Sequence, residues 1–281
     1  MTGHEIRRDR HLGTVVHIVA GRQNRPNLPS SDCPFCPGGL EAPEPYVTRA
    51  FPNRWPALGE GRCEVVLYSP DHDTNLAALG PEGVRKVIDM WADRTTALLA
   101  DPDVDFVLVF ENRGRSVGAT IDHPHCQIYA FDHVPARQRR LIDASWSPEP
   151  DPDERIVSTH GTWRAWIHDA PVHPVSIVLA PVERTADLQS LDARSREDLA
   201  HVLSDVLSRC DAMFGDAMPY MMWVNQAPRS EPSAWLHLEI VSPWRATGLP
   251  RYIAAAEVAT EEYFNPVDPL ELASRLNSMP R

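Results

Sequence analysis

The sequence has 281 residues, a formal net charge of −12, and 43% apolar and 23% charged residues. This is the composition of a globular chain long enough for one large domain or two small ones, each with a core. The acidity argues against non-specific nucleic-acid binding, which needs a basic surface, and no apolar run approaches a membrane span. Five scattered cysteines and no N-terminal signal pattern suit a reducing compartment, so we expect a cytoplasmic protein.

The first motif along the chain is the pair Cys33-x-x-Cys36, followed by a proline and two glycines. Such a knuckle supplies two of the four ligands that zinc prefers, and His72 and His123 are the candidates to complete the set. A redox pair, or plain structural thiols, are the alternatives. No thioredoxin-like strand and helix follow the knuckle, so the sequence favours zinc over a redox role.

The stretch His-Pro-His-Cys-Gln at residues 123–127 is the most informative part of the first half. A loop with two glycines and two arginines is expected just upstream at residues 111–118. Residues two apart on a strand share a face, so His123, His125 and Gln127 are expected to point one way and Cys126 the other. This pattern is typical of a phosphate-handling site; a surface strand with two chance histidines is the alternative. Around it, apolar patterning predicts strands at residues 64–68, 104–110 and 128–131 and a helix at residues 81–99.

The second half repeats this order weakly, as a duplicated strand-helix-strand unit would. It predicts strands at residues 163–167, 176–180, 220–224 and 235–241 and a helix at residues 195–214. Asn225 stands where Asn112 stood. His237 is aligned with His123 and Glu239 with His125, so His237 is expected to be a hydrogen-bonded core or interface histidine. Prolines 148, 150 and 152 mark the junction, and we expect halves at residues 1–147 and 153–281.

Several motifs together resemble the galactose-1-phosphate uridylyltransferase family, a branch of the histidine-triad superfamily. They are Arg22 and Arg25, the Cys-x-x-Cys knuckle, residues 51–58, 69–72, 110–114 and 123–127, and residues 235–239. The resemblance spans residues 8–276. It implies an α/β (or α+β) fold in which two histidine-triad-like halves form one continuous antiparallel sheet with helices packed on it. The implied activity is transfer of a nucleoside monophosphate, UMP by default, between UDP-glucose and a sugar 1-phosphate, galactose 1-phosphate by default.

The resemblance also implies roles for individual residues. His125 would be the nucleotidylated histidine, Gln127 the phosphoryl donor and His123 both a zinc ligand and the residue that orients His125. The zinc would be structural, held by Cys33, Cys36, His72 and His123. The positions that match base, phosphate and ribose contacts are Asn53, Trp55, Asn112, Gly118 and Thr120. Arg251, Tyr252 and Glu257 match a sugar-binding segment that the second subunit of a homodimer contributes.

The expected chemistry at His125 follows from its side chain. A covalent intermediate splits a difficult transfer into two displacements, and a neutral imidazole is a competent nucleophile at phosphorus. The sugar phosphate is a weakly basic leaving group, so the step needs aimed donors for the phosphoryl oxygens rather than a strong acid. The candidates are Gln127, Thr120, the backbone amides of residues 114–118 and the forked guanidinium groups of Arg22 and Arg25. Solvated loop charges are the alternative for the arginines.

The chain departs from the family pattern in ways that bear on function. Cys126 replaces a glycine, which we expect to be tolerated because its side chain faces away. Asn225 and Glu239 replace histidines and Leu141 replaces a carboxylate, so a second, iron-type metal site is expected to be absent. Tyr263 replaces a sugar-contacting glutamine, which puts the sugar in doubt. An NDP-sugar phosphorylase, a transferase for another sugar phosphate and a non-catalytic nucleotide-binding zinc protein remain alternatives.

Overall fold

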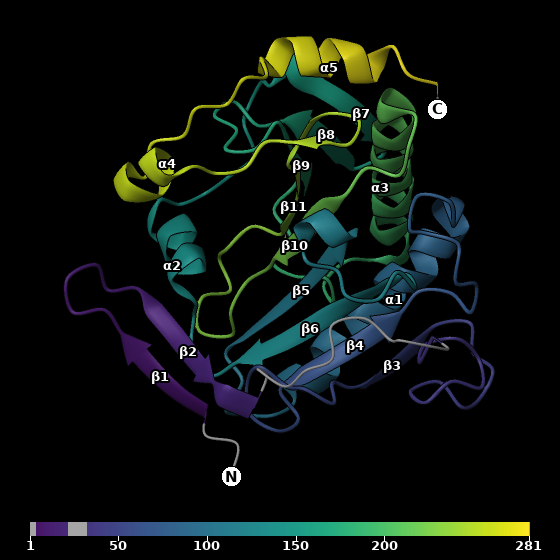
Figure 1. The fold of residues 1–281 in the computed structure, drawn as a ribbon, viewed down its shortest axis with the longest axis vertical. Helices are drawn as coiled ribbons and strands as arrows, with labels where there is room; N and C mark the ends of the chain where they lie inside the picture. The colour runs from purple at the N-terminus through teal and green to yellow at the C-terminus, as the bar shows by residue number, and fades with distance from the viewer. Residues whose placement is uncertain (1–3, 22–32, 281) are drawn as a thin grey trace.

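A computed structural model describes residues 4–21 and 33–280 and contains one large sheet with its two longest helices along one side (Figure 1). The strands are β1 (His4–Arg8), β2 (Val15–Val19), β3 (Arg49–Pro52), β4 (Cys63–Leu67), β5 (Phe106–Arg113), β6 (His125–Phe131), β7 (Ile156–His160), β8 (Trp163–Ile167), β9 (Val175–Pro181), β10 (Tyr220–Asn225), β11 (His237–Ser242), β12 (Trp244–Ala246) and β13 (Leu249–Pro250). The helices are α1 (Gly80–Leu99), α2 (Ala136–Asp143), α3 (Ala193–Phe214), α4 (Ala255–Thr260) and α5 (Pro269–Asn277).

The large sheet has nine strands in the order β3-β4-β6-β5-β10-β11-β9-β8-β7, and its neighbours are antiparallel. Two neighbouring strands near its centre come from different halves of the sequence: β5 pairs with β10, and Phe110 lies opposite Trp223. Outward from this seam the strands follow in the order β5-β6-β4-β3 on one side and β10-β11-β9-β8-β7 on the other. The two halves of the sequence therefore arrange their strands in nearly the same way. The expected continuous antiparallel sheet is confirmed, while the division at residues 147–153 stays a prediction.

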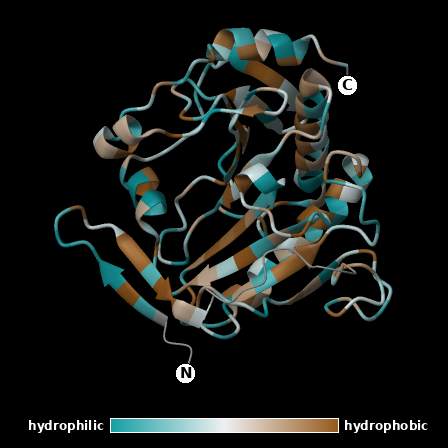
Figure 2. Cartoon of the chain, in the orientation of Figure 1, coloured by the Kyte–Doolittle hydropathy of each residue, from teal (hydrophilic) through white to brown (hydrophobic). Residues whose placement is uncertain are grey.

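Helices α1 and α3 cover one face of the sheet because each carries an apolar stripe. In α1, residues spaced three or four apart are buried, among them Val84, Ile88 and Trp91. Helix α3 begins where the Asp192 side chain accepts a hydrogen bond from the backbone N–H of Ser195, and it ends at Gly215. Together with α5, these helices enclose the main core. Figure 2 shows apolar residues concentrated along the central strands and on parts of these helices.

Along strand β6, side chains alternate strictly between the helix-covered face of the sheet and its open face. Cys126 and Ile128 are buried beneath the helices, and the indole N–H of Trp91 on α1 points at the Cys126 sulfur, 3.2 Å away. His125 and Gln127 are only partly buried and lie on the opposite, open face. The expected opposition of Cys126 to these two residues is confirmed, so a side chain at position 126 does not enter the open face.

Two local expectations were wrong. Residues 111–113 are not part of a loop, because β5 continues to Arg113 through its pairing with β10. Only residues 114–118 form the turn. His123 precedes the strand that begins at His125, so it is not bound by the two-residue alternation, and its ring faces Cys36 instead. A sequence pattern alone does not locate the first residue of a strand.

A buried carboxyl group links the two halves beneath the seam. Glu111 is 4% exposed and accepts hydrogen bonds from the hydroxyls of Tyr68, at 2.9 Å, and Tyr220, at 3.0 Å. Burial raises the pKa of Glu111 to about 7 from its ordinary value of 4.5, although the two hydroxyls and Arg113 act in the other direction. The protein therefore retains a proton here that the unfolded chain releases above pH 4.5.

The raised pKa of Glu111 predicts a specific loss of stability with rising pH. Between pH 4.5 and 7 the folded state binds the proton and the unfolded state does not, so this contribution is complete below pH 4.5 and disappears as pH rises through 7. In Glu111→Gln, the decrease of the unfolding free energy over this pH range should be smaller than in the wild type, by about 3 kcal/mol at most. Urea unfolding of both proteins at pH 5 to 8 measures this, and parallel curves would contradict it.

The hairpin of β1 and β2 stands apart from the body of the molecule at one side (Figure 1). Apolar side chains on it remain in solvent, with Leu12 at 82% and Ile6 at 52% exposure.

In the described part of the chain, no helix combines the length and apolarity needed to cross a bilayer.

Candidate active site

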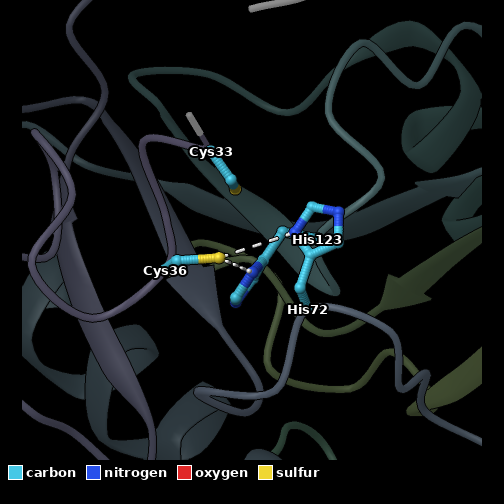
Figure 3. Close-up of side chains that lie close together, drawn as sticks. All are labelled: Cys33, Cys36, His72 and His123. Atoms are coloured by element: carbon cyan, nitrogen blue, oxygen red, sulfur yellow. Dashed lines mark hydrogen bonds between the residues drawn. The ribbon is translucent and has the colours of Figure 1, made fainter. Parts of the chain in front are cut away.

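Two thiols and two imidazoles lie close together near the N-terminal end of β6 (Figure 3). The ligand atoms of Cys33, Cys36, His72 and His123 all lie within 4.8 Å of one another. The Cys36 sulfur is 3.6 Å from Nδ1 of His72 and 3.7 Å from Nδ1 of His123. The structure therefore brings together the four residues predicted as metal ligands, and the group could bind a metal ion.

Backbone contacts bring these four ligands together from three segments. At the knuckle, a Cβ on Gly39 would lie 2.7–2.8 Å from the carbonyl oxygens of residues 33, 34 and 36, so only glycine lets the chain fold back so closely. The loop that carries His72 follows β4, and the Tyr68 N–H donates to the Pro124 carbonyl at 3.1 Å. That bond holds the His72 loop against the segment that carries His123.

Without a bound cation, the Cys36 thiol of this cluster stays protonated at neutral pH. Burial, and then the neighbouring Cys33, raise the pKa of the Cys36 thiol to about 11, so two adjacent thiolates are costly without a positive charge. Burial also lowers the pKa of His123, which keeps its ring neutral and able to coordinate. Two thiolates and two imidazoles form a donor set that suits zinc in tetrahedral coordination.

His125 is held in one orientation at the start of β6. Its Nδ1 lies 2.7 Å from the backbone carbonyl oxygen of His123. A carbonyl oxygen only accepts hydrogen bonds, so Nδ1 carries the proton of the neutral ring and Nε2 carries the lone pair. The Phe35 ring meets the His125 ring edge-on at 5.1 Å, which braces its orientation further. His125 is thus held in one orientation on the open face, and the lone pair of its neutral form is on Nε2.

Gln127 is oriented from the neighbouring loop. The Asn53 side-chain N–H donates to Oε1 of Gln127 at 3.1 Å, and the Trp55 backbone N–H donates to Oδ1 of Asn53 at 2.9 Å. The Tyr129 hydroxyl is 3.5 Å from the same Gln127 oxygen. Because the oxygen of Gln127 accepts these bonds, its amide nitrogen is the group that can donate to a ligand. The structure therefore groups three predicted site residues, Asn53, Trp55 and Gln127, beside His125.

The turn after β5 lies at the same side of the sheet. Gly118 adopts φ 90° and ψ 13°, a left-handed conformation that favours glycine, and a Cβ there would lie 3.8 Å from Nδ2 of Asn112. Thr120 follows two residues later and is partly buried. The two arginines of the predicted loop are engaged elsewhere: Arg113, at the end of β5, pairs with Asp211 at 2.8 Å, and Arg115, in the turn, pairs with Asp122 at 3.1 Å. Arg22 and Arg25 lie outside the described residues.

The sheet register corrects the alignment of the two halves. Gln127 lies opposite Phe110 and Glu239 lies opposite Trp223, while Phe110 and Trp223 are themselves partners across the seam. Glu239 therefore takes the place of Gln127, and His237 takes the place of His125, not of His123. The local bonding agrees, since Nδ1 of His237 is 2.9 Å from the Trp235 carbonyl two residues earlier.

The two equivalent histidines differ in access. His237 is 3% exposed, and the Trp146 ring stacks on it at 3.5 Å between centroids, in a cavity of about 300 Å³. Glu239 is engaged by the Asn225 amide at 2.9 Å and by Arg137 at 2.8 Å. His237 is a buried histidine with one bonded nitrogen, as expected, whereas His125 is partly exposed.

The predicted sugar-binding residues of the tail are mostly engaged with one another. The Arg251 guanidinium forms a buried ion pair with Glu257 and donates to the carbonyl oxygens of Phe264 and Val172, both at 3.0 Å. Glu257 also accepts from the backbone N–H groups of Ala254 and Phe264. Tyr252, by contrast, is 74% exposed. Within one chain, Arg251 and Glu257 thus hold the tail in shape and Tyr252 is presented to solvent.

Two residues near the site were missed by sequence reasoning. Tyr46 lies against His123, with its hydroxyl 2.8 Å from Nε2, and Phe35 lies against both His123 and His125. Tyr46 falls in an irregular stretch between the knuckle and β3, where no periodicity indicates a side chain's direction. Phe35 is within the knuckle itself, and its place between the two cysteines was the available signal.

Comparisons with known proteins agree with this arrangement. The profile of the N-terminal domain of galactose-1-phosphate uridyl transferase matches residues 48–135, and that of the C-terminal domain matches residues 124–245. The galactose-1-phosphate uridylyltransferase of Thermotoga maritima is 33% identical over 298 residues, covering 93% of this chain and 94% of the relative. That of Streptomyces lividans is 34% identical over 290 residues, covering 92% of this chain and 80% of the relative.

Solved structures share the architecture. A uridylyltransferase structure has a TM-score of 0.88 at 25% identity, covering 97% of both chains. An ADP-glucose phosphorylase from Arabidopsis thaliana has a TM-score of 0.77 at 21% identity, covering 99% of this chain and all of the other, and shares the fold. Fold and domain profiles together define a two-part uridylyl transferase. The chain belongs to the galactose-1-phosphate uridylyltransferase family.

Proposed function

We propose that this protein transfers UMP between UDP-glucose and galactose 1-phosphate through a covalent intermediate on His125. Family membership supports the reaction. The observation that carries the role of His125 is its bond to the His123 carbonyl, which fixes the lone pair on Nε2. A nucleophile held in one tautomer needs no reorganisation before it attacks.

The proposed reaction has two displacements at the same phosphorus atom. In the first, Nε2 of His125 forms a bond to the α-phosphorus of UDP-glucose, and the bond to the bridging oxygen breaks. That oxygen leaves with the electron pair as glucose 1-phosphate. In the second, an oxygen of galactose 1-phosphate attacks the uridylyl-histidine and the bond to Nε2 breaks, which restores the neutral imidazole and yields UDP-galactose.

The residues beside His125 fit the stabilisation that these steps require. The Gln127 amide nitrogen would donate to an α-phosphoryl oxygen, with Asn53 holding the amide in that orientation. Asn112, Gly118 and Thr120 would contact phosphate and ribose, and Trp55 the base. Arg22 and Arg25 are proposed as further phosphate contacts.

Two measurements test this function: formation of the uridylyl adduct, and transfer of the uridylyl group from the adduct to an acceptor. UDP-glucose alone should add one uridylyl group to the protein, detected by intact mass, and galactose 1-phosphate should then discharge it as UDP-galactose. Tyr263, 43% exposed in the tail, offers one hydroxyl and a large ring in place of an amide, so we expect galactose 1-phosphate to be a weaker acceptor than in typical relatives.

The kcat/KM values for galactose 1-phosphate, glucose 1-phosphate and inorganic phosphate decide the acceptor. A strong preference for phosphate would favour an NDP-sugar phosphorylase. A clear preference for galactose 1-phosphate that persists in Tyr263→Phe would contradict the role given to the tail. If no adduct forms with UDP-glucose or a panel of other NDP-sugars, the transferase proposal fails.

We propose that the metal is structural zinc, bound by Cys33, Cys36, His72 and His123. Thiols and protonated imidazoles must lose protons before they can bind the metal, so occupancy should fall in acid. Metal analysis of the purified protein should find one zinc ion per chain at neutral pH, and Cys36→Ser should reduce that content severely. Metal-free protein with a disulfide between Cys33 and Cys36 would overturn this assignment.

We further propose a homodimer that works in a reducing cytoplasm. The described residues include all five cysteines, and none of them forms a disulfide. The hairpin and the tail expose apolar side chains, including Ile6, Leu12, Val258 and Phe264, of a kind that subunit contacts bury. Light scattering should give twice the 31.5 kDa chain mass, and a monomer would contradict the proposal.

A further inference from the structure

Tyr46 lies at the junction between the cysteine knuckle, the His72 loop and His123. Its hydroxyl oxygen is 2.7 Å from the Phe35 carbonyl oxygen, 3.0 Å from the Ser69 carbonyl oxygen and 2.8 Å from Nε2 of His123. Phe35 lies between the two cysteines, and Ser69 precedes His72 by three residues. One side-chain oxygen therefore contacts all three segments that supply the metal ligands.

The bonds around Nε2 determine which nitrogen of His123 can bind metal. Nε2 is 2.8 Å from the Ser69 carbonyl oxygen, which only accepts, so Nε2 bears the proton. The Tyr46 oxygen lies within reach of that same N–H and accepts from it, while its own hydrogen is donated to the Phe35 carbonyl. The lone pair of His123 is thus on Nδ1, the nitrogen that faces Cys36.

His123 transmits this constraint to the nucleophile. Its backbone carbonyl accepts a hydrogen bond from the proton-bearing Nδ1 of His125, and the Phe35 ring contacts both imidazoles, at 6.1 and 5.1 Å. A His123 ring that is free to turn would weaken metal binding, and a knuckle that shifts would move Phe35 away from His125. The hydroxyl of Tyr46 opposes both movements.

We propose that Tyr46 is a positioning residue that fixes the metal-binding tautomer of His123 and locks the metal knuckle to the segment orienting His125. The inference rests on the proposed zinc site and, for its effect on rate, on the proposed transferase activity. Hydrogen bonds from outside the coordination sphere orient metal-bound histidines in this way, and their loss weakens metal binding by roughly 10- to 100-fold.

The test is Tyr46→Phe, which keeps the ring and removes only the hydroxyl. Zinc affinity, measured by competition with a chelating dye at pH 7, should fall roughly 10- to 100-fold. The absorption spectrum of the Co²⁺-substituted protein should change in its d–d bands, because the imidazole is less well oriented. With zinc saturating, the rate of uridylylation should fall while the KM for UDP-glucose stays within about twofold.

Tyr220→Phe is the matched control because it also removes a hydrogen-bonded tyrosine hydroxyl, the one that donates to Glu111 at 3.0 Å, outside the cluster. It should lower thermal stability without changing zinc affinity. Equal zinc affinities in wild type and Tyr46→Phe, or equal losses in Tyr46→Phe and Tyr220→Phe, would overturn the proposal. A wild-type protein that takes up no zinc would refute the metal site itself, and an inactive wild type with normal zinc affinity would refute only the transferase.

Discussion

The His125→Asn protein is expected to form no uridylyl adduct and to lose exchange activity by at least about 10³-fold, because the substitution removes the nucleophilic nitrogen. Asparagine is close to imidazole in size and can still donate to the His123 carbonyl, now from its amide, so the strand should keep its conformation. Binding of UDP-glucose should therefore survive. Intact-mass detection of the adduct and isothermal titration with UDP-glucose separate chemistry from binding.

His237→Asn is the control for this experiment. The same substitution is made at the equivalent strand position of the other half, where the histidine has the same bond to a carbonyl two residues earlier. Because Trp146 covers His237, this protein should still form the adduct even if it is less stable. An adduct in His125→Asn, or its loss in His237→Asn alone, would show that the nucleophile has been assigned to the wrong half.

Arg251→Met is expected to release the tail from the body of the protein. It leaves the Glu257 carboxylate, 3% exposed, without its charged partner, and an unpaired buried charge costs about 3 kcal/mol or more. If the tail opens locally, its open population should rise by roughly 100-fold. Chymotrypsin cleavage at Tyr263 and Phe264 under low-protease conditions measures that population.

The double variant Arg251→Met with Glu257→Gln supplies the control. It removes the charge that was left unpaired. The Ala254 and Phe264 N–H groups bond different oxygens of the Glu257 carboxylate, so the amide oxygen of the new side chain can accept from only one of them. Protease resistance should then recover in part. Equal cleavage of the single and double variants would mean that the ion pair does not hold the tail closed.

The helices and strands of this fold can be predicted from the sequence because the patterns that indicate them are local. Strand β8 matches its predicted bounds at residues 163–167, and α3 begins two residues before its predicted start. The metal cluster was also anticipated: the Cys-x-x-Cys knuckle predicts two ligands, and the family resemblance indicated His72 and His123 as the other two. For the helices, the strands and the knuckle, residue type and short spacing contain the information.

Features that depend on contacts between residues far apart in the sequence could not be predicted in this way. The equivalence of His237 and His125 follows from which residues face each other across β5 and β10, and spacing along the chain placed it two residues off. The extension of β5 through Arg113 likewise depends on its pairing with Tyr220, which comes much later in the chain. Engagement of Arg251 and Glu257 with each other is a tertiary contact that no motif reveals.

The seam between β5 and β10 has a consequence for how the chain reaches its native state. Residues 106–113 acquire their second strand partner only when residues 220–225 are available, and such distant contacts make folding slow. Until then, β5 is an exposed edge with the apolar sequence Phe-Val-Leu-Val-Phe. During synthesis, a ribosome-bound first half therefore presents an unpaired apolar strand that can pair with another copy of itself. In an architecture that joins two similar halves into one sheet, the apolar edge of the first half is therefore covered only when the second half folds against it.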